Sequence, residues 1–474
     1  MNPATWSALA AVTLLWAGSG FLAVRHLRCP ARGWRVVPLS LFGFAWIAFG
    51  AIFILRFFAL LYDPVLFQAS LFPPWMIPAS SLTRAWVWLG AYWCSFCLGL
   101  AIMLAVVPRR LPRLLGKLGL LDAPQNVAVL DLIVFSTTTV LVLTSFMGLP
   151  SALTTPIGHF CSLWVVPAAL AWHMHFRGAR IGARRFAYLV PGLAMFVLSP
   201  YREHLLGAFL CIALPAVQLK PRIGLLRILA VTAAILLASS VLLYVYRPVR
   251  WEGEDLSKTK EYVSPQLWRD TPGSAPWSKL ITRFHGFDSA ALTIWLVPGR
   301  FPFEDRQIPR ELLVGAFLPR AVYADKASVQ RGRLFSTSIW AYDEYGETPP
   351  RASAMIAPSM PGDLWSSGGA MVLVTGALAW GVIVGLLESW RRILSPAGAI
   401  ALVAFMALRV AGGIERDFVH ATASVIQLVI VLLLVLAALP LAARRPEHAP
   451  RRGDRPLSVS TDEPPPSRRP AIGD

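Results

Sequence analysis

The stretch ATASVIQLVIVLLLVLAALPLAA, residues 421–443, contains no charged side chain and decides the fold class. A helix needs about 20 apolar residues to cross the hydrocarbon core of a bilayer, and this run meets that length. Ten further apolar runs, two of them shorter, predict an all-α integral membrane protein with about eleven transmembrane helices. They lie at about 5–24, 36–55, 85–107, 127–147, 159–176, 186–200, 205–219, 228–246, 370–390 and 395–411.

The composition of the 474-residue chain excludes a soluble domain. Hydrophobic residues make up 56% and charged residues 15%, whereas soluble domains carry roughly 25% charged residues. The mean hydropathy of +0.57 agrees. The five cysteines lie in or beside apolar runs, so we interpret them as membrane-buried thiols and not as a metal or redox site. We expect no cofactor.

The formal net charge of +18 is distributed in a way that indicates topology and disfavours nucleic-acid binding. Lys and Arg gather in alternate connections between the apolar runs, and such connections face the cytoplasm. We therefore expect the N-terminus outside, the C-terminus inside and a disordered basic tail at 444–474. The basic connections contain Arg25 to Arg35, Arg109 to Lys117, Arg177 to Arg185, Lys220 to Arg227, and Arg391 with Arg392, whereas the others carry lone residues such as Arg56, Arg84, Arg202 and Arg416.

Residues 247–369 form a polar outer loop between the first eight spans (1–246) and the last three (370–443). The loop contains fifteen basic and fourteen acidic residues, so it is nearly neutral and does not suit a polyanion. Its residue pattern predicts two helices at the membrane surface and a helix start at the end of the loop. These are Lys279–Val297 capped by Ser278, Arg310–Leu318 after Pro309, and a cap at Asp363 for the next span.

Arg202 is the first candidate functional residue. It lies in the turn between two runs of fifteen residues, 186–200 and 205–219. A helix of that length covers about 22 Å, less than the hydrocarbon core of about 30 Å. The turn is therefore expected below the outer surface, where ionisable groups are costly and mark functional sites. The alternative is an Arg202–Glu203 pair that reaches the membrane interface.

The outer loop holds the other candidates. His285 and Asp288 are three residues apart on the predicted first helix and so share a face; the alternative is a solvated helix face. Arg283 lies on the same helix, and Arg320 and Lys326 follow the helix stop at Pro319.

Four stretches carry a resemblance to a known family, the bacterial O-antigen and exopolysaccharide repeat-unit polymerases. They are YREHLL (201–206), RFHGFD (283–288), FLPRAVYADK (317–326) and PGDLWSSGG (361–369). Each is similar to a short motif of that family, and they occur in the family's order with a large outer loop late in the chain. The resemblance implies a GT-C-like integral membrane glycosyltransferase in the bacterial inner membrane.

The resemblance also implies a reaction and a set of roles. The enzyme would transfer a growing glycan from undecaprenyl diphosphate to a second lipid-linked repeat unit, next to membrane lipid and the chain-length regulator or flippase of the same pathway. The cationic residues would hold the lipid diphosphate, and a base would accept the proton of the acceptor hydroxyl. The diphosphate residues are Arg202, Arg283, Arg320 and Lys326, and the candidate bases are Asp288, His285 and Asp363. The first outer loops contain no D-x-D, with Asp63 as their acidic residue, so we expect a metal-independent enzyme.

Three other functions remain open at this point. An O-antigen ligase-like transferase would use the same chemistry on a finished glycan. A secondary transporter or polysaccharide export permease would show internal repeats and matching interrupted helices, and we find no convincing repeat. A structural membrane scaffold would give no reason for a buried Arg202.

Overall fold

The computed structural model describes residues 2–26, 39–62, 77–106, 113–147, 157–198, 202–219, 286–304, 306–317 and 358–439, with positions 234 and 238. All regular structure in these ranges is helical, and they contain no strand. Apart from two positions, the expected span at 228–246 lies outside the described residues, as do 247–285 and 318–357 of the outer loop and the tail at 444–474.

Eight helical segments are long and apolar enough to cross a membrane. Because such helices satisfy their own backbone groups within lipid, the protein is an all-α, multi-pass membrane protein, as the apolar runs predicted. The eight are α1 (Pro3–His26); Leu41–Tyr62, formed by α2 (Leu41–Phe49), the π-helical η2 (Gly50–Leu55) and α3 (Arg56–Tyr62); α4 (Ala79–Val106); Val127–Thr144 within α6 (Val127–Met147); Ile157–Phe176 with η5 (Ser162–Trp164) and α8 (Val165–Phe176); α19 (Met360–Ile393); α20 (Pro396–Gly413); and α21 (Phe418–Ala438).

The two short apolar runs fold differently from each other. The run at 186–200 breaks into α9 (Arg184–Ala187) and α10 (Val190–Leu198), and nine residues of helix cover only about 13 Å. The second run forms α11 (Arg202–Leu219), one helix of 18 residues that begins at Arg202 itself. Eight segments of spanning length occur among the described residues, and neither of these two short runs is one of them.

The described part of the outer loop contains the two expected helices. α16 (Gly286–Leu296) and α17 (Ile308–Phe317) fall at the predicted places, with Pro309 in the first turn of α17. α19 begins at Met360, about ten residues before the predicted span, and leaves helical geometry at Gly368 and Gly369. Gly369 has a φ of +69°, which favours glycine. The break gives α19 a short first segment that carries Asp363.

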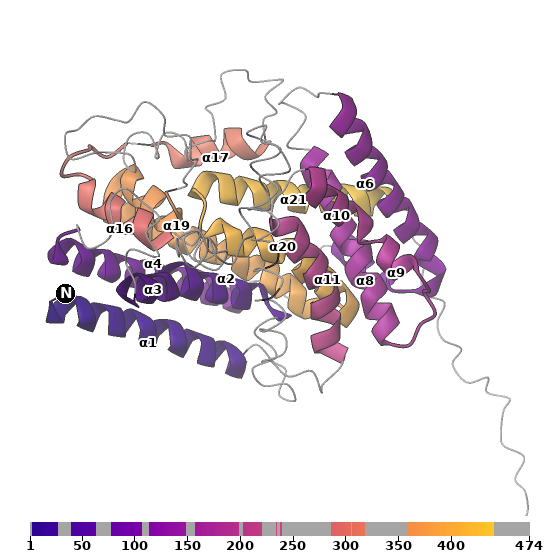
Figure 1. Ribbon diagram of the computed structural model, residues 1–474, viewed down its shortest axis with the longest axis horizontal. Coiled ribbons are helices and arrows are strands. Elements are labelled where there is room, and N and C mark those ends of the chain that lie inside the picture. Colours follow the sequence, from indigo (N-terminus) through magenta and orange to yellow (C-terminus); the bar gives the residue numbers. More distant parts are fainter. Residues whose placement is uncertain are drawn as a thin grey trace, which may run out of the picture.

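The helices form two groups that meet at α20. One group contains α1, α2, α4, α19, α20 and α21, and the other contains α6, α8, α10 and α11 (Figure 1). Within the first group, α4 and α19 approach closely because glycines lie where the two helices touch. A Cβ atom on Gly99 would lie 2.1 Å from the Leu378 carbonyl oxygen, and one on Gly381 would lie 2.0 Å from that of Phe96. Small residues commonly permit such contact between membrane helices.

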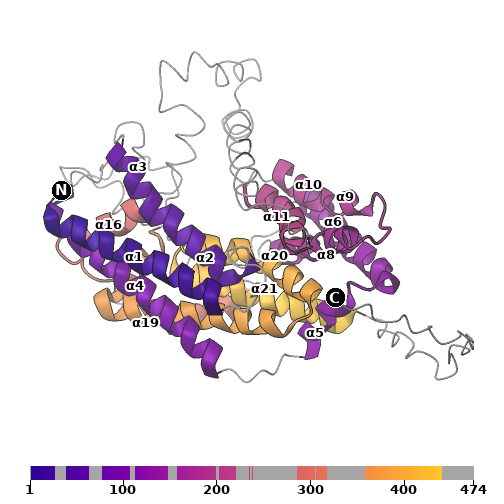
Figure 2. The same ribbon diagram turned by 90° about the horizontal axis from the view of Figure 1, so that it is seen from below.

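Two opposite ends of this bundle can be distinguished. At the first, called the α16 end, α1 and α4 begin together, with the Thr5 and Thr83 hydroxyl oxygens 2.7 Å apart. α16 lies at the same end (Figure 2). The second, called the α5 end, holds α5 (Arg113–Leu120) and η4 (Pro124–Asn126). There the Lys117 ammonium donates to the Leu436 carbonyl 2.7 Å away, near the end of α21.

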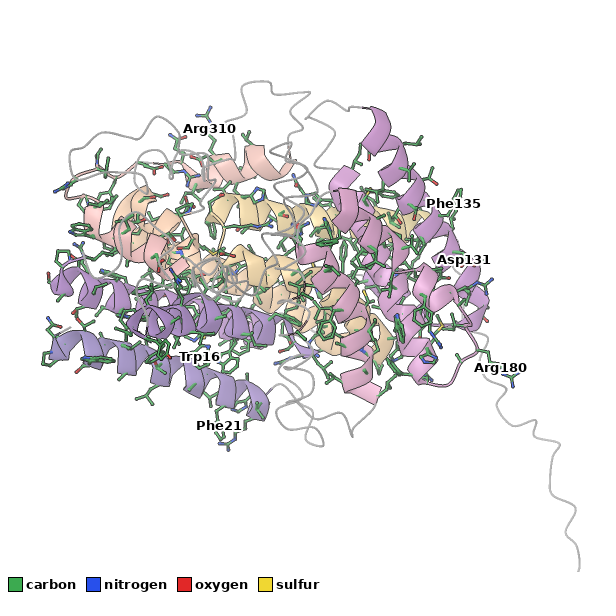
Figure 3. The ribbon with its side chains drawn as sticks, viewed as in Figure 1. Trp16, Phe21, Asp131, Phe135, Arg180 and Arg310 are labelled. Carbon is green, nitrogen blue, oxygen red and sulfur yellow. The ribbon has the colours of Figure 1, made fainter. Side chains whose placement is uncertain are left out.

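Large apolar side chains cover the outside of the bundle. Phe21 of α1 and Phe135 of α6 are 59% and 71% exposed, and both project outward in Figure 3. Trp16, on α1, instead stacks on Trp46 with the ring centroids 4.2 Å apart. Exposed aromatic and aliphatic side chains on spanning helices are expected where the surrounding solvent is lipid.

Candidate functional site

A buried ion pair joins the second membrane segment to the outer loop. Arg56 begins α3 directly after the π-helical turn, and Asp288 lies in the first turn of α16. The Arg56 Nη2 atom donates to Asp288 Oδ2 at 2.7 Å, and Nε donates to Oδ1 at 3.3 Å. Both side chains are buried, with 0% and 2% exposed. The pair therefore fixes α16 against the bundle.

The surroundings of this pair are aromatic and closely packed. Phe287 stacks on Trp86 and contacts the edge of Phe57, each with ring centroids 4.9 Å apart. Gly286 lets α16 begin directly on η2, because a Cβ there would lie 2.2 Å from Ile52 Cγ2. Burial raises the pKa of Asp288 above its ordinary value, and the charge and hydrogen bonds of Arg56 oppose that shift.

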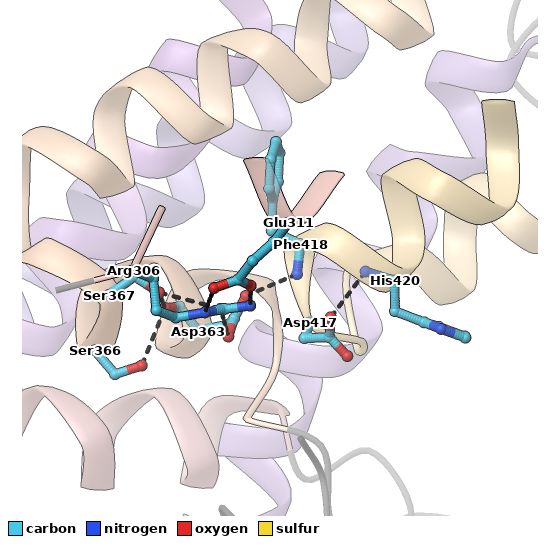
Figure 4. Close-up of polar contacts among 8 residues, drawn as sticks. All are labelled: Arg306, Glu311, Asp363, Ser366, Ser367, Asp417, Phe418 and His420. Atoms are coloured by element: carbon cyan, nitrogen blue, oxygen red, sulfur yellow. Dashed lines mark hydrogen bonds and ion pairs between the residues drawn. The ribbon is translucent and has the colours of Figure 1, made fainter. Parts of the chain in front are cut away.

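Asp363 joins three segments of the polypeptide. Its Oδ1 atom accepts from Arg306 Nη1 at 2.9 Å, and its Oδ2 atom accepts from the Phe418 backbone N–H at 2.9 Å. Arg306 also pairs with Glu311 and donates to the Ser367 hydroxyl at 3.3 Å (Figure 4). Burial alone would lower the pKa of Arg306, but its carboxylate neighbours raise it above its ordinary value.

This arrangement corrects the capping role expected of Asp363. The N-cap position of α19 is Ser359, and Asp363 lies four residues later, inside the helix. The Asp363 carboxylate is fully buried and bonds to groups outside its own helix. It therefore ties the start of α21 and the segment before α17 to α19.

A third charged cluster surrounds the start of α11. The Glu203 Oε2 atom lies 3.3 Å from Arg409 Nη1 on α20 and 3.3 Å from Arg416 Nη2 in the following turn. Two guanidinium groups thus share one carboxylate oxygen, which leaves local positive charge. His159 and His420 interact electrostatically with the same three residues. A group of this kind suits an anionic ligand.

The contacts of Asp363 and the charged cluster around Glu203 are connected through residues 416–420, at the start of α21. Arg416 binds Glu203, and the Phe418 N–H binds Asp363. Between them, Asp417 caps α21 by accepting from the His420 N–H at 2.8 Å. We use the name polar layer for the set formed by Arg56, Glu203, Asp288, Arg306, Asp363, Arg409 and Arg416.

The sequence-predicted site residues have different outcomes. Asp288 and Asp363 both lie at the α16 end, buried and each bound by an arginine. Arg202 begins α11 directly before Glu203, and its side chain is not among those described. Glu203 itself binds Arg409 and Arg416. The remaining candidates, Arg283, His285, Arg320 and Lys326, lie outside the described residues.

Four arginines of the polar layer were not selected as candidates from the sequence. Arg409 is a lone charge within an apolar run, and Arg56 directly follows one; such a charge marks a functional or structural ion pair in a membrane segment. Arg306 and Arg416 lie in polar connections, where a single arginine has no distinguishing pattern. Among the residues that the structure describes, no group of three His, Cys, Asp or Glu side chains is placed to bind a metal ion.

Comparisons with known proteins found no relative of this chain. No protein-family model, no curated protein and no solved structure matches the chain. The fold and the polar layer thus define the class: a multi-pass α-helical membrane protein with paired charges buried at one end of its bundle.

Proposed function

We propose that the protein polymerises undecaprenyl-diphosphate-linked oligosaccharide repeat units into a surface polysaccharide, such as an O-antigen or exopolysaccharide. One structural observation supports the proposal in addition to the motif resemblance. Glu203, Asp288 and Asp363 come from three separate motif stretches, and all three lie in the polar layer at the α16 end. The start of α11 brings Arg202 to the same end.

The proposal includes an orientation in the bacterial inner membrane. Lys117, Arg177 and Arg391 belong to the basic connections, and the described contacts of Lys117 and Arg177 place them at the α5 end with α21's last turn and Asp122. Basic connections face the cytoplasm. The polar layer would then face outward, with the N-terminus outside and the C-terminus in the cytoplasm.

The proposed reaction exchanges one bond to an anomeric carbon for another. The bond between C1 of the growing glycan and the diphosphate oxygen breaks, and the diphosphate leaves with the electron pair. The acceptor hydroxyl oxygen bonds to C1 and gives its proton to a base. No metal ion is required, because guanidinium groups stabilise the leaving diphosphate, and each charge-assisted hydrogen bond contributes about 1.5–3 kcal/mol.

The polar layer supports a division of roles among the proposed site residues. Arg202, Arg283, Arg320 and Lys326 would hold the diphosphate, and the local positive charge around Glu203 favours an anion beside Arg202. Asp288, His285 and Asp363 are the candidate bases, in that order. The raised pKa of Asp288 suits a proton acceptor, provided that Arg56 shifts its hydrogen bonds as the acceptor binds.

The test is the length of surface glycan in cells that carry single substitutions. Arg202→Ala, Arg283→Ala and Arg320→Ala are each expected to reduce the rate by roughly 10²–10³, so that long ladders on a gel collapse to one repeat unit. Arg310→Ala is the matched control, because Arg310 is exposed on α17 (Figure 3). Each variant is compared at equal protein abundance.

Two results would contradict the proposal. Unchanged ladders in all three variants would exclude a role for these arginines in polymerisation. Long chains that accumulate on the lipid carrier would instead indicate a ligase, because polymerisation would then be intact and transfer to the final acceptor would be lost.

A further inference from the structure

A second set of paired charges lies at the α5 end, between the end of α8 and the start of α9. The Arg177 Nη1 atom lies 2.9 Å from Asp122 Oδ2, and the Arg184 Nε atom lies 3.4 Å from Asp131 Oδ2. Both arginines are nevertheless 57% exposed. Arg180, between them in the chain, is also exposed and projects away from the body of the molecule (Figure 3).

The two carboxylates are themselves anchored from within the bundle. Asp122 is buried, and its Oδ1 atom lies 3.0 Å from His173 Nδ1 on α8. The Tyr188 hydroxyl donates to Asp131 Oδ1 at 2.5 Å. Each acidic group therefore holds its arginine at a defined place on the surface. A cation that is already positioned loses less conformational freedom when it binds an anion.

The loop is anchored by a buried side chain and lies beside exposed apolar side chains. Ile181 at its centre is buried, and the Arg185 guanidinium lies over the Phe186 ring with its Cζ 4.9 Å from the centroid. Phe186 and Val190 are 54% and 51% exposed. Fixed cations next to exposed apolar groups complement a molecule that has a phosphate and an acyl chain.

We propose that Arg177, Arg180 and Arg184 form a binding site for the headgroup of an anionic phospholipid in the leaflet at the α5 end. The lipid phosphate would bind the guanidinium groups, and its acyl chains would lie along Phe186 and Val190. A free phosphate would gain nothing from those apolar side chains, so the observations favour a lipid. This site is separate from the polar layer and does not depend on the proposed polymerase activity.

The experiment is a lipid titration of the purified full-length protein in detergent, followed by native mass spectrometry. Phosphatidylglycerol and phosphatidylcholine are the two probes, and we expect the wild type to bind phosphatidylglycerol more tightly. Juxtamembrane arginines contribute about 1 kcal/mol each, so Arg177→Gln with Arg184→Gln is expected to weaken that binding roughly thirtyfold. Arg177→Lys with Arg184→Lys retains the charge and most of the affinity. Arg310→Gln, at the opposite end, leaves binding unchanged.

Arg180→Gln keeps the test valid if the double variant does not fold. It leaves both ion pairs in place and is expected to weaken phosphatidylglycerol binding about fivefold. Equal binding of the two lipids by the wild type, or unchanged binding by every arginine variant, would overturn the proposal. Displacement of the lipid by millimolar inorganic phosphate would also overturn it, because the site would then be one for free phosphate.

Discussion

Replacement of Arg56 by alanine is expected to lower the free energy of unfolding by about 3–5 kcal/mol. The reason is that Asp288 would remain buried without its counter-charge, in surroundings of aromatic rings. Chemical or thermal unfolding of the purified protein in detergent measures this loss. Arg310→Ala, which removes an exposed arginine, is expected to change stability by less than about 0.5 kcal/mol.

A double variant distinguishes the ion pair from general packing. Arg56→Met combined with Asp288→Leu replaces both charged side chains by apolar ones of similar volume, and such replacements are often neutral or stabilising. We therefore expect the double variant to be far more stable than Arg56→Ala. If the losses of the two single variants simply add in the double variant, the two side chains do not form a coupled pair.

The same double variant separates folding from chemistry. Asp288 is the first candidate base, so the folded double variant is expected to display single repeat units on the cell surface. Wild-type ladders from this variant would exclude Asp288 as the base and leave His285 and Asp363 as the candidates.

Replacement of Asp363 by alanine has the second large expected effect. It removes the buried partner of Arg306 and leaves the Phe418 N–H without an acceptor. The expected loss is about 3–5 kcal/mol for the broken ion pair and about 1–3 kcal/mol for the unsatisfied N–H. Because Asp363 connects α19 to α21 and to the segment before α17, the apparent melting temperature should fall and glycan ladders should shorten together.

Glu311 provides the matched control for Asp363. It pairs with the same Arg306, but 32% of its side chain is exposed, so Glu311→Gln is expected to cost less than about 1 kcal/mol. Asp363→Asn retains an oxygen acceptor and should be more stable than Asp363→Ala. Equal stability of Asp363→Ala and Glu311→Gln would show that the buried contacts of Asp363 do not hold these segments together.

The sequence pattern predicts the membrane architecture well because spanning helices have a strong local signal. The run at 421–443 corresponds to α21 of the structure. Pro309 likewise marks the start of α17. The apolar run at 186–200 contains no charged residue, yet it breaks into α9 and α10.

The pairing of charges could not be predicted in the same way. Arg56 and Asp288 are 232 residues apart, and no local periodicity connects two side chains at that separation. Asp363 illustrates the opposite error: its position before an apolar run indicates a cap, yet the buried side chain bonds to Arg306 and Phe418 instead. Tertiary contacts therefore decide what these carboxylates do.

The most direct measurement uses purified protein and a defined undecaprenyl-diphosphate-linked oligosaccharide in lipid nanodiscs. Mass spectrometry of the products follows whether glycans grow by whole repeat units. The wild type and Arg310→Ala are expected to give a series of products with undecaprenyl diphosphate released at each step, whereas Arg202→Ala gives none above background. Failure of the folded wild type to lengthen the glycan, or equal lengthening by Arg202→Ala, would contradict the proposed activity at the polar layer.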